Sequence, residues 1–216
     1  HSISREDQEK MALSSHQKAA AAQDGNFFEN EIIPVNGIDV DGCVRPETSL
    51  ESMSKLKPAF NKDGVVTAAT SSPLTDGAAA VLVCSADYAN NNDLEILAYI
   101  RGMAVSGCAP EIMGIGPVLS SQKAIERAGI NLEDVDIIEM NEAFAAQSLA
   151  CVEELGIDMS KLNTHGGAIA MGHPLGASGA RITGKAASLL KETGKRYALS
   201  TTVSYTHLTL PTRLLV

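Results

Sequence analysis

The chain has 216 residues, of which 44% are hydrophobic and 20% are charged, a composition that allows a globular protein with a sizeable buried core. Its formal net charge of −9 and its lack of a basic run argue against a nucleic-acid partner and against binding to an anionic membrane surface. No apolar run approaches the about 18 residues of a membrane span, and the first residues lack a signal-peptide pattern, so we expect a cytoplasmic protein.

The first half of the chain is predicted to contain two helices and two strands. A start signal at Ser4 and an alanine-rich run predict a helix of about twenty residues that ends near positions 24–25. Loose alternation predicts a strand at residues 27–35, which a turn closes. Residues 47–56 are predicted to form a second helix, and the apolar residues 81–83 a buried strand.

The second half alternates between strands and helices, the order that is typical of a layered α/β domain. Four polar residues at positions 90–93 predict a boundary before it. The predicted elements are a strand at 94–103, helices at 117–129, 146–155 and 182–191, and further strands at 135–140 and 196–202.

A glycine-rich stretch at residues 165–181 stands out, because glycine lets the backbone turn sharply and approach a ligand closely. Within it, His173 lies between Gly172 and Pro174, where a stiffened chain fixes the direction of the ring. A lone histidine is more often structural than catalytic. We nevertheless interpret His173 as a catalytic base, because a second polar cluster precedes it in the chain.

That second cluster, residues 141–145 (Asn-Glu-Ala-Phe-Ala), follows a predicted strand and precedes a predicted helix. Open α/β sheets place ligand chemistry at such positions. Together with residues 75–80 (Thr-Asp-Gly-Ala-Ala-Ala) and 114–117 (Gly-Ile-Gly-Pro), the two clusters make four motifs in one order. In these motifs the chain resembles the thiolase family, the acyl-CoA C-acyltransferases, from about its first residue to about residue 202.

The resemblance implies an α/β fold, the layered αβαβα arrangement of thiolases, with the C-terminal core domain and part of the loop domain present here. On this basis residues 1–74 would complete the loop domain, and residues 75–93 would be the last segment of the N-terminal core domain. Residues 94–202 would form an incomplete C-terminal core domain. Residues 203–216 resemble nothing in the family and form a foreign-looking tail.

The activity that the resemblance implies is reversible Claisen condensation and thiolysis between acetyl-CoA and a 3-oxoacyl-CoA, with acetoacetyl-CoA as the expected substrate. His173 and Asn141 would be catalytic: the histidine as the base that deprotonates the nucleophile, the asparagine as part of an oxyanion hole completed by a bound water. Thiolases place the contacts to CoA and the acyl group at positions that match Ser72, Met113, Ala143, Phe144 and Gly172.

No cofactor or metal is implied, because the coenzyme A thioester is itself the substrate. The expected partners are acyl-CoA, CoA and further copies of the chain, in a homodimer or homotetramer of the full-length protein. Four cysteines lack the CxxC spacing of zinc sites, which predicts reduced thiols without a metal. They are Cys43, Cys84, Cys108 and Cys151.

Thiolases also use two catalytic cysteines, one in the N-terminal core domain and one in a Cys-x-Gly motif after the strand that matches residues 196–202. The sequence contains neither motif, and residues 203–216 contain no glycine or cysteine. We therefore expect a fragment that is truncated at both ends and inactive as an isolated chain. None of the four cysteines lies in a motif that could replace them.

Two alternatives belong to other functional classes. The first is a non-catalytic acyl-CoA-binding or interaction module of thiolase-like fold, for which retained CoA affinity without turnover would be the evidence. The second is nucleotide binding, because residues 179–186 come within one residue of a P-loop. The missing Ser or Thr removes a metal ligand, and a P-loop precedes a helix rather than lying within one.

Overall fold

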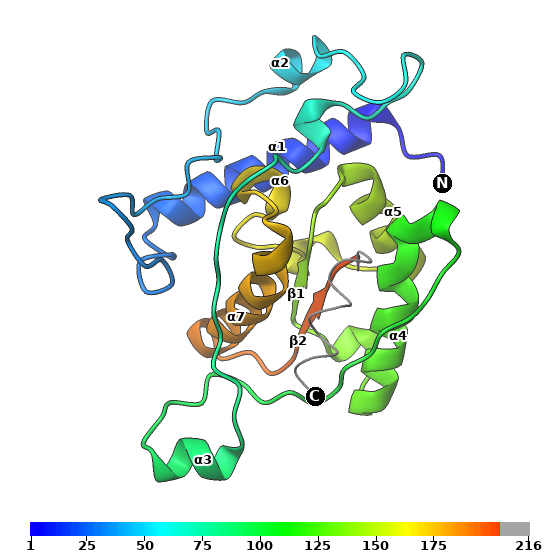
Figure 1. The fold of residues 1–216 in the computed structure, drawn as a ribbon. Coiled ribbons are helices and arrows are strands. Elements are labelled where there is room, and N and C mark those ends of the chain that lie inside the picture. Colours follow the sequence, from blue (N-terminus) through cyan, green and yellow to red (C-terminus); the bar gives the residue numbers. More distant parts are fainter. Residues whose placement is uncertain (204–216) are drawn as a thin grey trace. The chain divides into compact units, whose positions relative to one another are not determined.

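The computed structural model describes residues 1–203 (Figure 1). Their contacts divide the chain into two compact units, each assembled from segments that are far apart in the sequence. Unit 1 comprises residues 1–76, 141–156 and 163–173, and unit 2 comprises residues 77–140, 157–162 and those from 174 onward. The predicted domain limits stay predictions, and the foreign-looking tail lies outside the described residues from position 204.

Unit 1 is built around α1 (Arg5–Asp24), the twenty-residue helix that the sequence predicts. Ser4 caps it, because its hydroxyl accepts a hydrogen bond from the backbone N–H of Asp7. Four further elements of unit 1 contact α1, and Figure 1 shows α6 beside it. They are α2 (Leu50–Ser54), the 3-10 turn η1 (Ala68–Thr70), α5 (Ala145–Leu155) and α6 (Ala168–Met171).

Half of the buried residues of α1 are alanine or serine, and these small side chains let neighbouring segments approach its backbone. Ala12 and Ala19 are fully enclosed. A Cβ atom added to Gly166, whose φ is +82°, would lie 2.6 Å from the Cβ of Ala19. Only glycine therefore fits at position 166, for both steric and conformational reasons. Four polar residues of α1 are also buried: Gln8, Glu9, Ser15 and His16.

Two predicted elements between α1 and η1 differ from the structure. The predicted strand at 27–35 is wrong: residues 25–31 form turns, and only a single bridge pairs Val35 with Ile38. Asn26 and Asn36 adopt positive φ angles, which break the extended path. The helix predicted at 47–56 exists but is shorter than predicted: α2 begins after its cap at Ser49 and ends at Ser54.

Unit 2 contains a parallel pair of strands, β1 (Ile137–Met140) and β2 (Ala198–Thr201), with Ile137 opposite Ala198 and Met140 opposite Thr201. Helix α7 (Leu175–Thr193) packs on both strands, and α4 (Gly116–Ala128) contacts β2 (Figure 1). The predicted strands at 135–140 and 196–202 and the helices at 117–129 and 182–191 are confirmed, although α7 begins seven residues earlier than predicted. The remaining elements are α3 (Ala86–Asn91) and the 3-10 turns η2 (Pro110–Ile115), η3 (Leu132–Asp134) and η4 (Met159–Lys161).

The carboxylate of Asp136 fastens the beginnings of the two strands to each other. It accepts hydrogen bonds from the backbone N–H groups of Tyr197 (3.1 Å) and Arg196 (3.0 Å). These two bonds, with smaller contributions from nearby lysines, lower the pKa of the Asp136 carboxyl. A single acidic side chain just before β1 therefore sets where β2 starts.

Two further predicted strands are wrong. Residues 81–83 and 94–103 are not in strands, and their large apolar side chains are exposed rather than buried, for example 74% for Leu82 and 70% for Met103. A strand needs a neighbour that accepts and donates its backbone hydrogen bonds, and no described segment pairs with these two. Among residues 1–203, none of the helices combines the length and the apolar character needed to cross a lipid bilayer.

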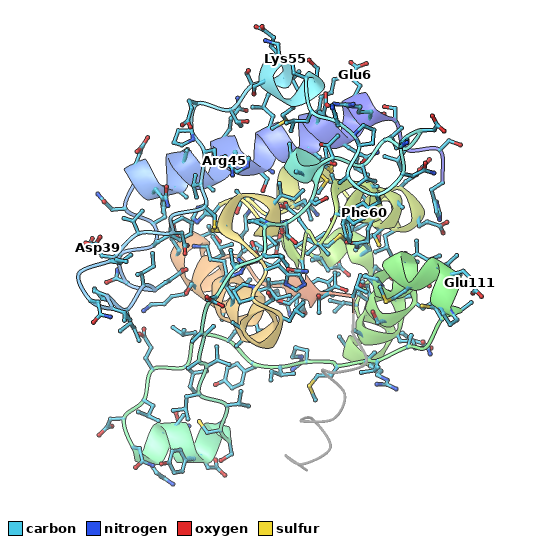
Figure 2. All side chains as sticks on the ribbon, turned by 45° about the horizontal axis from the view of Figure 1, so that its top comes forward. Glu6, Asp39, Arg45, Lys55, Phe60 and Glu111 are labelled. Carbon is cyan, nitrogen blue, oxygen red and sulfur yellow. The ribbon has the colours of Figure 1, made fainter. Side chains whose placement is uncertain are left out.

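Buried His16 connects a long loop to α1. Its Nδ1 accepts a hydrogen bond from the backbone N–H of Arg45, 3.2 Å away, and Figure 2 shows Arg45 over this helix. Burial, and secondly the positive charge of Arg45, lower the pKa of His16 below its ordinary value of 6.5, whereas Glu47 raises it. A protonated Nδ1 could not accept the bond, so the folded chain favours the neutral ring.

We expect the free energy of unfolding to rise with pH just below 6.5, because the unfolded state binds the His16 proton more tightly than the folded state. This contribution is complete above the unfolded pKa and is lost as the pH falls toward the lowered folded pKa. Urea unfolding across this window should show the slope. His16→Asn, which keeps an acceptor but does not titrate, should reduce it, and an unchanged slope would contradict the assignment.

Candidate active site

The structure brings together the two side chains that the sequence singles out most strongly. Nδ2 of Asn141 lies 3.3 Å from Nε2 of His173. Asn141 follows β1 directly and is fully buried, whereas His173 is half-buried and follows α6. The amide nitrogen can donate to Nε2 when the neutral ring carries its proton on Nδ1, so the direction of this contact depends on the tautomer of His173. The Oδ1 atom of Asn141 is buried and has no hydrogen-bond partner within residues 1–203.

The backbone next to the histidine is fixed by Thr75. The Oγ1 atom of Thr75 accepts a hydrogen bond of 2.9 Å from the backbone N–H of His173. Gly172 has a φ of +97°, and a Cβ atom there would lie 2.6 Å from the same Oγ1. Glycine is therefore needed at this position, both for its dihedral angle and for the approach of the threonine. The sequence places Thr75 in a motif but gives no sign of this contact.

The predicted substrate-binding residues Ser72, Ala143 and Phe144 also lie side by side. The backbone N–H of Ser72 donates to the carbonyl oxygen of Ala143 at 3.0 Å, and Ser71 forms a bridge with Phe144. The ring of Phe144 packs edge-on against Phe60, with ring centroids 5.8 Å apart. Phe60, which Figure 2 labels, is 74% exposed. Phe144, one member of this aromatic pair, lies three positions after Asn141 in the chain.

A buried carboxylate follows Asn141 in the chain. Glu142 is 2% exposed and accepts three hydrogen bonds: from Ser15 Oγ (2.7 Å), Asn163 Nδ2 (2.7 Å) and the backbone N–H of Ile169 (3.2 Å). Ser15 also accepts from the backbone N–H of Gly167 at 3.0 Å. The sequence did not identify Ser15 or Asn163, because neither lies in a recognisable motif.

Two further residues of the sequence analysis are Met113 and His165, the first residue of the glycine-rich stretch. Met113 belongs to η2 of unit 2 and is 42% exposed, so its predicted place in an acyl pocket stays a prediction. His165 packs against the rings of Phe27 and Phe28, with centroid distances of 4.6 and 6.1 Å.

Burial raises the pKa of the Cys151 thiol. In the part of the chain that is described, no three His, Cys, Asp or Glu side chains are grouped as metal ligands would be.

The residues near His173 combine groups with complementary chemistry. An imidazole can take up or release a proton near neutral pH, and an amide fixed beside it can orient a carbonyl oxygen or a water molecule. The P-loop-like residues 179–186 lie inside α7, so they do not form a phosphate-binding loop before a helix. The groups near His173 are therefore suited to proton transfer, and residues 179–186 do not provide a P-loop.

Comparison with known families agrees with these motifs. The family model described as "Thiolase, N-terminal domain" matches residues 1–87, and the one described as "Thiolase, C-terminal domain" matches residues 94–206. The chain belongs to the thiolase family. His173 and Asn141 both lie in the part that matches the C-terminal domain of thiolases.

Individual thiolases agree closely with this chain. The 3-ketoacyl-CoA thiolase of Vibrio parahaemolyticus is 49% identical over 214 residues, which are 93% of this chain and 55% of the relative. The crystal structure of human mitochondrial 3-ketoacyl-CoA thiolase in complex with CoA has a TM-score of 0.88 and 43% identity, over 94% of this chain and 52% of that one. The Bacillus anthracis acetyl-CoA acetyltransferase has a TM-score of 0.87 and 39% identity, over 93% and 53% of the two chains.

These likenesses confirm the predicted thiolase-like α/β fold. The chain spans about half the length of the thiolases that it matches. The mixed helical and strand content of units 1 and 2 agrees with this fold.

Proposed function

We propose that this chain carries the histidine and asparagine half of a thiolase active site, which transfers acyl groups between a 3-oxoacyl-CoA and CoA. The observation that supports this most is the 3.3 Å approach of Asn141 Nδ2 to His173 Nε2, between two motifs of the family. The relatives are named 3-ketoacyl-CoA thiolase or acetyl-CoA acetyltransferase. We propose acetoacetyl-CoA as the first substrate to test.

Cleaving a C–C bond beside a thioester needs a nucleophile, a base, and donors for the oxygen that becomes negative. His173 would act as the base that generates a thiolate, and its ring N–H would then donate toward the thioester oxygen. Asn141 would complete the same oxyanion hole by orienting a water molecule. Its buried Oδ1, which lacks a partner among the described side chains, supports this role, because an acceptor there could fix a water.

The substrate would lie along residues 71–72 and 143–144. The backbone contact between Ser72 and Ala143 fixes these two segments to each other, and Phe144 would offer an apolar wall to the acyl group. CoA is a substrate in this scheme and not a resident cofactor. One structural relative was crystallised with CoA, which supports the choice of ligand.

The acylated cysteine of thiolases has no matching motif in these 216 residues. Cys151 is buried and its pKa is raised, which suits a packed thiol and not a nucleophile. The proposed reaction needs a nucleophilic cysteine that meets His173, and we propose that a full-length thiolase, about twice the length of this chain, supplies it.

The deciding assay is thiolysis of acetoacetyl-CoA, followed through the loss of enolate absorbance. It should be run on the 216-residue chain and on the product of the complete surrounding reading frame. We expect activity only in the longer product. Activity in neither, with CoA binding retained in calorimetry, would replace the proposal with a non-catalytic CoA-binding protein.

A further inference from the structure

The side chain of Ser15 connects helix α1 to both segments that supply the candidate catalytic residues. It lies 127 positions before Glu142 and 152 positions before Gly167 in the chain. Its hydroxyl donates to Glu142 Oε2 at 2.7 Å and accepts from the Gly167 N–H at 3.0 Å. A hydroxyl has one donor and two acceptor sites, so both bonds form at once. Ser15 is 3% exposed, so solvent does not replace these bonds.

The loop that meets Ser15 lies unusually close to α1. A Cβ atom on Gly166 would lie 2.7 Å from the carbonyl oxygen of Ser15. A Cβ atom on Gly167 would lie 2.1 Å from the carboxyl carbon of Glu142. Two glycines in sequence therefore let the loop backbone reach both the helix and the carboxylate. We call the contact between Ser15, Glu142 and Gly167 the junction. Its three members touch one another so closely that displacement of one has to displace the others.

Two of the three members of this junction are close in sequence to the proposed catalytic residues. Glu142 directly follows Asn141, and its carboxylate also binds the N–H of Ile169 at the start of α6. Four residues after Ile169 the chain reaches His173. The amide of Asn141 and the ring of His173 thus belong to two segments whose backbones Glu142 and Ser15 join.

We propose that Ser15 and Glu142 are positioning residues, which hold Asn141 against His173 without touching substrate. Their effect on turnover rests on the thiolase function proposed above, whereas their effect on the geometry of the pair does not. Misplacement of a catalytic group by about 1 Å can cost about a hundredfold in rate. We therefore expect the loss of the Ser15 hydroxyl to lower the rate of thiolysis by up to this factor, although α1 carries no proposed catalytic residue.

The test compares Ser15→Ala with the matched control Ser14→Ala on the same helix. Ser15→Ala removes both bonds of the hydroxyl while it fills less space, so we expect the chain to fold. Glu142→Gln is a second variant: it keeps the size of the side chain but leaves one oxygen to serve three donors. Urea unfolding of the 216-residue chain establishes that each variant is folded.

Two readouts then distinguish positioning from general stability. In the 216-residue chain, ¹⁵N NMR of the His173 ring reports its tautomer. We expect wild type and Ser14→Ala to show one tautomer, and Ser15→Ala and Glu142→Gln to show a mixture. In the longer product, kcat for thiolysis should fall about tenfold to a hundredfold in the two junction variants, with little change in KM.

Wild-type ring signals and wild-type kcat in Ser15→Ala and Glu142→Gln would overturn the proposal. So would failure of Ser15→Ala to fold, because the hydroxyl would then support the fold as a whole. A wild-type longer product without thiolysis activity would instead contradict the proposed function, and the ring signals would still decide whether Ser15 positions His173.

Discussion

Replacing His173 with asparagine is expected to lower kcat for thiolysis by about 10²- to 10⁴-fold in the longer product. Asparagine is polar but shorter than histidine, and its amide atoms match the position of Nδ1 rather than that of Nε2, which lies 3.3 Å from Asn141. It cannot take up a proton near neutral pH, so no base would remain to generate the thiolate. Steady-state kinetics with acetoacetyl-CoA measure the loss, and the unfolding midpoint should change little.

The same substitution at His1 is the matched control. The ring of His1 is one-third exposed and lies 3.8 Å from a carboxylate oxygen of Glu154, and His1 belongs to none of the four motifs. We expect His1→Asn to keep wild-type kcat. Near-normal activity of His173→Asn would remove the histidine from the role of base, whatever the state of the fold.

Gly167→Ala is expected to destabilise the 216-residue chain by about 3 kcal/mol. The φ and ψ angles at this position are extended, so alanine causes no backbone strain, and the cost is steric. The added Cβ would lie 2.1–2.3 Å from the carboxylate atoms of Glu142. A carboxylate at the end of a flexible side chain could normally move away. Here it is buried and held by three hydrogen bonds, so moving it breaks them.

Gly179→Ala supplies the comparison for this variant. Gly179 lies inside α7, is exposed, and has no atom within 4 Å of an added Cβ. Alanine is favoured over glycine in a helix interior by about 0.5–1 kcal/mol, so this variant should gain stability. Urea unfolding of the two variants should therefore give opposite signs. Equal stability of Gly167→Ala and wild type would show that the Glu142 junction is not rigid.

Several helices could be predicted from the sequence because their signals are local. The cap at Ser4 and the left-handed Gly129 mark the start of α1 and the end of α4 where the sequence predicts them. The start of α7 was missed, because glycines at positions 176 and 179 suggest a loop. Packing on β1 and β2 stabilises that helix despite its glycines.

Strand predictions succeeded only where a partner strand exists. The apolar run that ends at Met140 pairs with β2 and is buried. The run at 94–103 has a similar apolar content but remains exposed and outside any strand. An alternating hydrophobic pattern shows that a segment could form a strand in a sheet. Whether it does depends on a second segment that pairs with it, and the pattern does not reveal that segment.

The sequence by itself determined the family, the main helices, and the two motifs that contain Asn141 and His173. Those properties depend on residues close together in the chain, and local patterns carry them. Only the tertiary structure decided that Thr75 fixes the backbone at His173, and that Ser15 joins Glu142 to the glycine turn. Hydrogen bonds between residues about a hundred positions apart leave no periodicity or spacing in a sequence, because chain folding alone brings their atoms within 3 Å.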